Sequence, residues 1–590
     1  MTAEADRYVR RFAAQLRRGG VANVVICPGS RSTPLTLAFT DDSTGIKPWL
    51  HLDERSAGYF ALGLARQLDE PVALVCTSGT AAANFLPAVV EAWLSRVPLV
   101  VLTADRPREL RDVGASQTID QVDLYRGHVL WSVDMPVADG SEAVDRYAVG
   151  VAARATELAT GSPAGPVHLN FPFREPLLDQ STAQTTATLS AEAASPSVAG
   201  TAVTAGVLDL SSEMATRLVA AFTGRRGLIV CGPESQGLPA EELVALAGAL
   251  GWPLLADPLS GLRVGTHELT SVVETYDALL SDEAFAASVE PEVVLRFGAA
   301  LTSKPANQWI ATLTDAAHYV VDAGGWRDPD ALATEVVRAE PAAFARALLS
   351  QAGASADDAW LARWVAANEA ARGALRDALA ALDEPFEGRA SVELLDALPD
   401  GATLVVGNSM AVRDVDTFLP SQGRDVRIVG TRGAAGIDGV VSTAVGAAAA
   451  GRGPVALLIG DLSFFHDLNG LWALRRHGLD LMVLLVNNDG GGIFHFLPQA
   501  ELVPDRFEEW FGTSHGLEFR SGVEMHGGTF VALEGHSGWG DELAGALGES
   551  GLAVLELRTE RVRNVELHRQ IRTEVQDTVR DALKSAGVTS

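Results

Sequence analysis

Short apolar runs recur along this chain of 590 residues, and helix-like stretches separate them. The runs are rich in β-branched residues and show little alternation of apolar and polar positions, which is typical of strands covered on both faces. Strands that alternate with helices in this way predict doubly wound α/β domains built on parallel sheets. The predicted strands are Asn23–Cys27, Val72–Cys76, Pro98–Thr103, Val167–Asn170, Gly227–Cys231, Val293–Phe297, Tyr319–Val321, Thr403–Val406, Val426–Val429, Val455–Ile459, Leu481–Val486 and Ala553–Leu557.

Two stretches interrupt this alternation and divide the chain. Leu178–Gly206 is rich in Ala, Ser and Thr and is predicted to be a linker. Ala342–Leu382 is rich in Ala and is predicted to be a helical crossing between domains. The length is sufficient for several domains. We therefore predict three doubly wound α/β domains, near residues 1–180, 205–340 and 350–590.

Composition and charge exclude several classes of protein. A net charge of −29 argues against a nucleic-acid partner. The sequence contains no run of about 18 uncharged apolar residues, so no membrane span is expected. The charged N-terminus lacks the apolar core of a secretory signal. Cys27, Cys76 and Cys231 stand in or beside strand-like runs and are predicted to be buried, reduced thiols. Together these features predict a cytoplasmic protein.

Polar residues follow two of the predicted strands at the point where each strand ends. Gly460-Asp461 follows Val455–Ile459, and Asn488 follows Leu481–Val486. Because parallel strands open on the same edge of a sheet, these side chains can meet although they are distant in sequence. A carboxylate, an amide oxygen and the carbonyl of Gly490 form an oxygen-only set that suits Mg²⁺. An ordinary βαβ unit with polar strand ends is the alternative interpretation.

The N-terminal part carries a second group of polar strand ends. Arg31 lies in a Pro-Gly-Ser turn near a predicted helix start, a place that binds anions through backbone N–H groups and charge. Glu54 is placed just before a small-residue helix, where an exposed helix-capping acid is the alternative. Arg106 follows another strand end and Gln117 lies in a polar loop. A salt-bridged structural arginine is the usual alternative for Arg106.

Longer motifs resemble one family of thiamine diphosphate (ThDP) enzymes. The spacing of Gly460-Asp461 and Asn487-Asn488 resembles the diphosphate motif of ThDP enzymes, except that Leu462 stands where many members have Gly. The whole set resembles the 2-succinyl-5-enolpyruvyl-6-hydroxy-3-cyclohexene-1-carboxylate synthase family of menaquinone biosynthesis, over nearly the full length. The motifs are CPGSRSTPLT, HLDERSAGYFALGLA, TSGTAAAN, TADRPRELRDVGASQTIDQ, RFGAALTSKPANQW, GNSMAVRD, GTRGAAGIDGVVSTAVG and GDLSFFHDLNGL with VNNDGGGIFHFLP.

This resemblance implies a set of residues that bind ThDP with Mg²⁺, or with Mn²⁺ as the alternative ion. Asp461, Asn488 and the Gly490 carbonyl would hold the metal on the diphosphate. Glu54 would hydrogen-bond the aminopyrimidine ring and act as the catalytic acid–base. Ile437 would wedge between the two rings of the cofactor. The remaining cofactor-binding residues implied are Thr80, Ser409, Met410, Gly460, Leu462, Ser463, Gly491 and Ile493.

The same resemblance implies 2-oxoglutarate and isochorismate as substrates. Both are dicarboxylates, so the pocket requires several cations, and the fork of arginine matches a carboxylate. The implied substrate-binding residues are Ser30, Arg31, Ser32, Arg106, Gln117, Lys304, Arg413, Arg432 and Phe494. Members of the family form one site from the first and third domains of different subunits. A homodimer or a dimer of dimers is therefore implied.

Two other functions stay open at this point. The first is another ThDP-dependent 2-oxo acid decarboxylase or carboligase, although the cation cluster argues against simple pyruvate chemistry. The second is a non-catalytic nucleotide-binding protein, because a fold alone does not assign a function. The absence of a clear G-x-G-x-x-G after a strand weakens the dinucleotide interpretation. The combination of Glu54 with Asp461 and Asn488 weakens the non-catalytic one.

Overall fold

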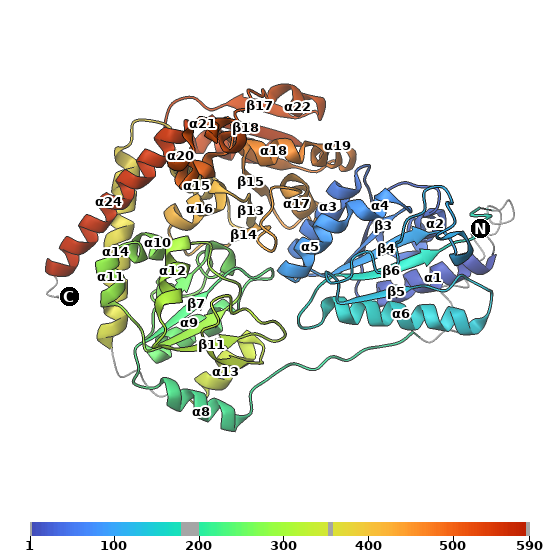
Figure 1. Cartoon of the computed structure of the whole chain (residues 1–590), viewed down its shortest axis with the longest axis horizontal. Helices are drawn as coiled ribbons and strands as arrows, with labels where there is room; N and C mark the ends of the chain where they lie inside the picture. Colours follow the sequence, from blue (N-terminus) through green and yellow to red (C-terminus); the bar gives the residue numbers. More distant parts are fainter. Residues whose placement is uncertain (1–2, 179–199, 352–357, 586–590) are drawn as a thin grey trace. The chain divides into compact units, whose positions relative to one another are not determined.

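The computed structural model describes residues 3–178, 200–351 and 358–585 (Figure 1). They form three six-stranded sheets, and every strand pair in them is parallel. This confirms the α/β fold class. Most of the predicted linker lies outside the described residues, and residues 200–206 contain neither helix nor strand. The Ala-rich stretch forms two helices, α13 (Pro341–Leu349) and α14 (Asp358–Ala381), and residues 352–357 between them lie outside the described part.

The chain folds into two compact units. The first unit contains Met1–Gly206, Thr431–Arg452 and His466–Leu479. The second contains Val207–Gly430, Gly453–Phe465 and Asp480–Ser590. The division into three domains predicted above stays a prediction.

The first sheet lies in the first unit, with strand order β2-β1-β3-β4-β6-β5. Side chains of its central strands pack with those of α1 and α6, for example Val75 with Phe12 and Ala152, in one apolar core. The strands are β1 (Asn23–Ile26), β2 (Lys47–Leu50), β3 (Val72–Cys76), β4 (Leu99–Asp105), β5 (Trp131–Asp134) and β6 (Val167–Pro172). The helices of this unit are α1 (Ala3–Arg18), α2 (Thr33–Phe39), α3 (Glu54–Leu68), α4 (Thr80–Asn84), α5 (Leu86–Ser95), α6 (Glu142–Thr160), α17 (Val440–Ala449) and α19 (Trp472–His477).

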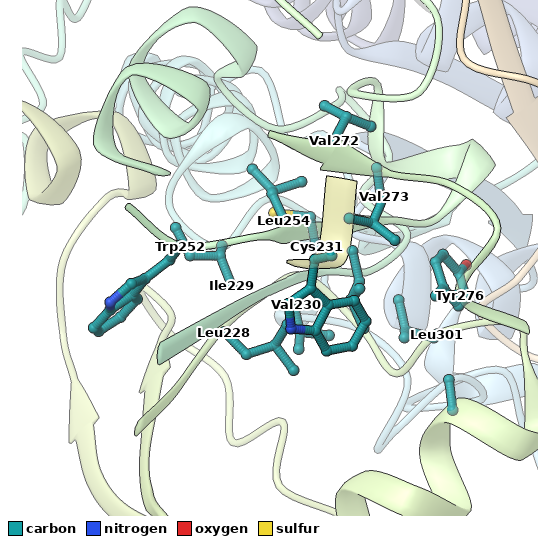
Figure 2. Close-up of a cluster of buried hydrophobic side chains, with 14 of the residues drawn as sticks. Leu228, Ile229, Val230, Cys231, Trp252, Leu254, Val272, Val273, Tyr276 and Leu301 are labelled. Carbon is teal, nitrogen blue, oxygen red and sulfur yellow. The ribbon is translucent and has the colours of Figure 1, made fainter. Parts of the chain in front are cut away.

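The second sheet has the order β12-β11-β10-β7-β8-β9. Figure 2 shows part of its core, in which Ile229 and Cys231 lie near Leu254 and Tyr276. Trp252 packs directly over the start of β7, where a Cβ at Gly227 would overlap the indole ring. The strands are β7 (Gly227–Cys231), β8 (Leu254–Ala256), β9 (Val272–Val273), β10 (Val293–Phe297), β11 (Ala317–Val321) and β12 (Ala333–Val337).

The third sheet has the order β14-β13-β15-β16-β18-β17. Gly460 at the end of β15 pairs in register with Val486 of β16, so the polar segments that follow these strands start side by side. The strands are β13 (Ala402–Val406), β14 (Val426–Gly430), β15 (Val455–Gly460), β16 (Leu481–Asn487), β17 (Thr529–Ala532) and β18 (Leu552–Arg558).

Further helices cover the second and third sheets. They include a 3₁₀ helix, η5 (Gly492–Phe496), and a π-helical turn, η6 (Glu508–Gly512). The other helices are α8 (Ser212–Phe222), α9 (Ala240–Leu250), α10 (Tyr276–Leu280), α11 (Glu283–Ser288), α12 (Lys304–Thr312), α15 (Glu387–Ala397), α16 (Met410–Phe418), α18 (Asp461–His466), α20 (Gln499–Leu502), α21 (Pro504–Phe507), α22 (Arg520–Met525), α23 (Gly540–Leu547) and α24 (Arg561–Ser585).

All twelve predicted strands are present, with ends shifted by two residues or fewer. The sequence analysis missed β2, β5, β8, β9, β12 and β17. Each of these lies at a sheet edge or next to one. β17 illustrates why these strands were not predicted. Most of its residues are exposed, so its sequence does not need a continuous apolar run.

Two further expectations can be compared with the structure. Cys27, Cys76 and Cys231 are buried and form no disulfide, as predicted. Within the described residues, none of the helices combines the length and the apolar character that a membrane span requires.

Helix α17 packs closely against α3 within the first unit, and Figure 1 shows the two helices side by side. Two glycines permit this approach. A Cβ at Gly63 would overlap the carbonyl oxygen of Thr443, and a Cβ at Gly446 would overlap that of Phe60. The loop that precedes α17 is also held against α3, because Asp438 accepts a hydrogen bond from the Tyr59 hydroxyl.

Candidate active site

Glu54 is the first residue of α3 rather than a residue before the helix, which corrects the predicted helix start. Asp53 is the N-cap, and its carboxylate accepts a hydrogen bond from the backbone N–H of Arg55 at 3.0 Å. Glu54 is therefore not the capping acid. Burial raises the pKa of Glu54, and the negative charge of Asp53 raises it further. A carboxyl group with a raised pKa is suited to proton exchange near neutral pH.

A buried carboxylate anchors the start of α3. Asp467 accepts hydrogen bonds from the backbone N–H of Ser442 at 2.6 Å and from the Ser56 hydroxyl at 3.3 Å. These donors belong to α17 and α3, so one carboxylate ties both helices together. Burial raises the pKa of Asp467 to about 6. Beside it, the Arg55 guanidinium donates to the carbonyl of His466 at 2.7 Å.

The loop that carries Ile437 is fixed from both sides. The Tyr59 hydroxyl of α3 donates to the carboxylate of Asp438, and a Cβ at Gly439 would overlap the Tyr59 ring. Upstream, the buried Glu91 of α5 accepts from the backbone N–H groups of residues 433 and 434, at 2.9 and 2.7 Å. Ile437 remains 37% exposed. An exposed aliphatic side chain on a braced loop fits the predicted wedge.

Arg31 and Arg106 come together in the first unit with Gln117. Arg106 donates to the Ser78 hydroxyl and, at 2.9 Å, to the carbonyl of Gln117. Burial lowers the pKa of Arg106, and the positive charge of Arg31 lowers it further. Ser78 was not predicted, because the strand-end motif drew attention only for its small residues.

Arg31 keeps one donor that the protein does not use. Its guanidinium donates to the carbonyl of Phe173 at 3.0 Å and to the exposed carboxylate of Glu175 at 3.1 Å. Its Nε–H is buried and has no acceptor among the described residues. Two neighbouring cations with a spare buried donor suit a carboxylate ligand.

The other predicted residues of this unit are less closely connected. Ser32 is buried and donates to the carbonyl of Gly29 at 3.0 Å, whereas Ser30 and Thr80 are exposed. Arg432 directly precedes the loop held by Glu91.

The segments that follow the two strand ends of the third sheet meet through Asp461 and Gly490. Asp461 is buried, and its Oδ2 accepts from the backbone N–H of Gly490 at 3.0 Å. Its Oδ1 accepts from the N–H of Leu462 at 2.6 Å. His515 lies next to the same carboxylate, with its Nε2 3.2 Å from Oδ2 of Asp461. Burial raises the pKa of Asp461.

Asn488, in the segment that leads to Gly490, has an amide oxygen that no described residue uses. Its Nδ2 donates to Glu387 at 3.0 Å, while Oδ1 is buried and accepts no hydrogen bond from the described residues. The carbonyl of Gly490 accepts from the N–H of Gly492 at 3.0 Å and keeps a second lone pair. A Cβ added at Gly460 would meet no atom of the described residues within 4 Å. An orphaned buried oxygen, a carboxylate and a carbonyl fit a hard cation such as Mg²⁺.

A metal site of this kind depends on amide and carbonyl oxygens. Across the described ranges, no group of three or more His, Cys, Asp and Glu side chains could hold a metal ion. The absence of such a group is compatible with the predicted set, because that set contains one carboxylate only.

Gly490 and Gly491 make room for the chain itself. Cβ atoms at these two positions would overlap the carbonyl oxygens of Gly512 and Phe511, respectively. The π-helical turn η6 therefore already requires these glycines. Phe494 packs edge-on against Phe511 with ring centroids 5.8 Å apart. Ile493 is its neighbour in η5.

Ser409 has a strained backbone at the start of α16. Its φ of 66° is unusual for a residue with a Cβ, and strain of this kind concentrates at functional sites. Arg413 donates to the carbonyl of Ser409 at 2.6 Å. Met410, which follows Ser409, is buried. Ser463 is buried one turn into α18. Lys304 is exposed at the start of α12.

Two residues around the metal set escaped the sequence analysis. Glu387 is the first residue of α15 and is buried, which together with Asp414 raises its pKa to about 7. His515 accepts from the backbone N–H of Leu517 through Nδ1 at 2.9 Å, and its Nε2 lies 3.2 Å from Oδ2 of Asp461. Neither residue belongs to a sequence motif. Each can be recognised only from its position in the folded chain.

Known proteins resemble this chain along its length. Family models for the thiamine pyrophosphate enzyme N-terminal domain, middle domain and C-terminal domain match residues 7–124, 204–405 and 418–557. A 2-succinyl-5-enolpyruvyl-6-hydroxy-3-cyclohexene-1-carboxylate synthase from Geobacillus thermodenitrificans is 47% identical, over 100% of this chain and 99% of that protein. The chain belongs to this synthase family. A relative of the same name from Chloroflexus aurantiacus is 46% identical, over 99% of this chain and 97% of that protein.

Membership of the synthase family confirms the resemblance drawn from the motifs. The chain is a ThDP-dependent enzyme of the transferase type. A solved structure from Mycobacterium smegmatis, described as a thiamin diphosphate-dependent enzyme, shares the fold with a TM-score of 0.67 and 19% identity. That match covers 92% of this chain and 98% of the other.

Proposed function

We propose that this synthase-family chain decarboxylates 2-oxoglutarate and adds the remaining succinyl unit to isochorismate, with release of CO2, in menaquinone biosynthesis. Family membership supports this reaction. The structural observation that supports it best is the buried Nε–H of Arg31, which has no acceptor among the described residues. A substrate with two carboxylates requires such cations.

Glu54 would hold and return the proton at the pyrimidine ring of the cofactor. When bound, ThDP would supply a nucleophilic carbon that adds to the 2-oxo acid and a thiazolium ring that takes up the electrons left by CO2. The raised pKa of Glu54 keeps its carboxyl group able to share a proton with a ring nitrogen. Ile437 would press against the cofactor from its braced loop and favour the bent shape.

Asp461, Asn488 and the Gly490 carbonyl would hold the divalent metal. We propose Mg²⁺, with Mn²⁺ as a substitute, because all three groups offer oxygen. Thr80, Ser409, Met410, Gly460, Leu462, Ser463, Gly491 and Ile493 complete the proposed cofactor set. The proposed substrate residues remain Ser30, Arg31, Ser32, Arg106, Gln117, Lys304, Arg413, Arg432 and Phe494.

We also propose that the enzyme works as a homodimer or a dimer of dimers in the cytoplasm. The family resemblance supports a site that two subunits complete. The mass of the native assembly, measured by sedimentation or light scattering, tests this point. A monomer with full activity would contradict it.

Release of CO2 by the purified protein tests the function. We expect release from 2-oxoglutarate in the presence of ThDP and Mg²⁺, and formation of the adduct when isochorismate is added. Pyruvate is the matched control, because it lacks the second carboxylate. Preferred use of pyruvate would support a different ThDP-dependent decarboxylase. No release from either acid would support a non-catalytic protein.

A further inference from the structure

Glu387 lies in contact with the proposed metal ligand Asn488. It begins α15 and is only 3% exposed. Its Oε1 accepts a hydrogen bond from Nδ2 of Asn488 at 3.0 Å and another from the hydroxyl of Thr559 at 2.8 Å. One oxygen of one buried acid therefore joins three segments that are far apart in sequence.

This contact decides which end of the Asn488 amide faces the metal set. An amide carries donors on its nitrogen and lone pairs on its oxygen. Because Oε1 of Glu387 accepts, the nitrogen faces Glu387 and Oδ1 faces the other way. Gly492 leaves room for this amide, since a Cβ there would lie 2.7 Å from Nδ2. Oδ1 is left buried without a hydrogen bond from the described residues.

The preceding asparagine shows that this orphaned oxygen is specific to Asn488. Asn487 also donates to a buried acid, through Nδ2 to Glu556 at 2.7 Å. Its oxygen, however, accepts from the backbone N–H of Asp489 at 3.1 Å. Both ends of the Asn487 amide are used within the protein, as in a structural residue. Of these two neighbouring asparagines, Asn488 is the one whose oxygen is left for a ligand.

We propose that Glu387 is a positioning residue that orients the amide of Asn488 so that Oδ1 binds the metal. The inference rests on the proposed function, which assigns Asn488 as a metal ligand. Partners of this kind fix the direction of metal ligands, and their loss typically costs about 10–100-fold in metal affinity. Glu387 does not touch the metal in this arrangement and acts through Asn488 alone.

Titration of the purified apoprotein with Mg²⁺ at saturating ThDP tests the proposal, with calorimetry and tryptophan fluorescence as readouts. Glu387→Met removes the acceptor at similar volume and should weaken Mg²⁺ binding about 10–100-fold. Thr559→Val is the matched control, because it removes the other hydrogen bond to the same oxygen and leaves Asn488 in place. We expect Thr559→Val to bind Mg²⁺ like the wild type. Glu387→Gln keeps a carbonyl acceptor and should restore most of the affinity.

A double-mutant cycle separates this inference from the proposed function. Asn488→Ala should weaken Mg²⁺ binding, and adding Glu387→Met should then cause no further loss. Wild-type affinity in Glu387→Met, together with weak binding in Asn488→Ala, would overturn the positioning role only. Wild-type affinity in Asn488→Ala would overturn the metal assignment itself.

If Glu387→Met does not fold, the wild-type holoenzyme decides the question. A crystal structure with Mg²⁺ and ThDP should show Oδ1 of Asn488 on the metal and Nδ2 on Glu387. A separation of Nδ2 and Glu387 beyond about 3.5 Å would overturn the proposal, since no hydrogen bond spans that distance.

Discussion

The backbone N–H of Gly490 donates to Oδ2 of Asp461 at 3.0 Å, and this bond joins the ends of two neighbouring parallel strands. It explains how two short motifs far apart in sequence act as one site. The carboxylate is held by backbone donors that do not depend on other side chains. Its position is therefore set before any ligand binds, which lowers the cost of ordering the site.

Asp461→Ala should abolish Mg²⁺-dependent binding of ThDP while the protein stays folded. We expect affinity to fall by more than about 100-fold, because loss of an outer partner alone costs about 10–100-fold. Calorimetry with ThDP and Mg²⁺ measures this, and circular dichroism checks the fold. Asp541→Ala, which removes an exposed acid from α23, is the control. Equal affinity in both variants would remove Asp461 from the metal site.

Glu54→Gln should bind ThDP normally and lose most turnover. The side chain keeps its size but no longer shares a proton, and acid–base contributions amount to about 10²–10⁴-fold. Glu142→Gln, which neutralises an exposed acid in the first turn of α6, is the control. Steady-state turnover should stay near the wild-type value in that control. A loss below about tenfold in Glu54→Gln would show that the carboxyl group is not the acid–base.

Arg106→Ala should impair use of 2-oxoglutarate and isochorismate without weakening ThDP binding. Loss of a charge-assisted hydrogen bond costs about 1.5–3 kcal/mol, or roughly 10–150-fold in kcat/KM. Arg31→Ala should behave in the same way. Arg174→Ala is the control, since Arg174 is exposed and pairs with the exposed Glu109. Normal kinetics in both Arg31→Ala and Arg106→Ala would make the pair structural.

His168 should make the first unit less stable as the pH falls. It is buried against Thr103 and Tyr125, and burial lowers its pKa from 6.5 to about 3. On acidification the unfolded chain therefore binds a proton that the folded chain does not bind. The free energy of unfolding that is present above pH 6.5 falls as a result, by up to about 1.4 kcal/mol per pH unit.

Thermal unfolding of wild type and His168→Gln at several pH values measures this effect. The stability advantage of the wild type should shrink from about pH 7 to about pH 4.5. A difference that does not change with pH would show that the imidazole titrates normally.

Gly63→Ala should destabilise the contact between α3 and α17. The added methyl group would overlap the carbonyl of Thr443, and such overpacking costs about 1–3 kcal/mol. Gly150→Ala in the exposed middle of α6 is the matched control, because a Cβ there meets open space within the described structure. Helix propensity should stabilise that variant by about 0.5–1 kcal/mol. Urea unfolding of both variants would show opposite signs, and equal signs would contradict the packing argument.

The sequence by itself determined the fold class, the family and the main site motifs. Central strands such as β3 and β16 are buried on both faces, so their residues must be apolar, and this requirement is visible without a structure. The motifs around Glu54 and Asp461 are equally local. The helix start at Glu54 was placed wrongly, because adjacent acids at a helix start look alike and only the hydrogen bond of Asp53 distinguishes them.

Only the tertiary structure decided which side chains meet. Exposed edge strands such as β17 carry no continuous apolar run, so they were missed. Arg31 and Arg106 became a pair, and Asn488 acquired Glu387 as its partner, through the packing of distant segments. A hydrogen bond depends on the distance and angle between two groups, and no spacing along one chain encodes these for residues on different elements. The orphaned oxygen of Asn488 therefore became visible only after the sheet and α15 had brought its neighbours into place.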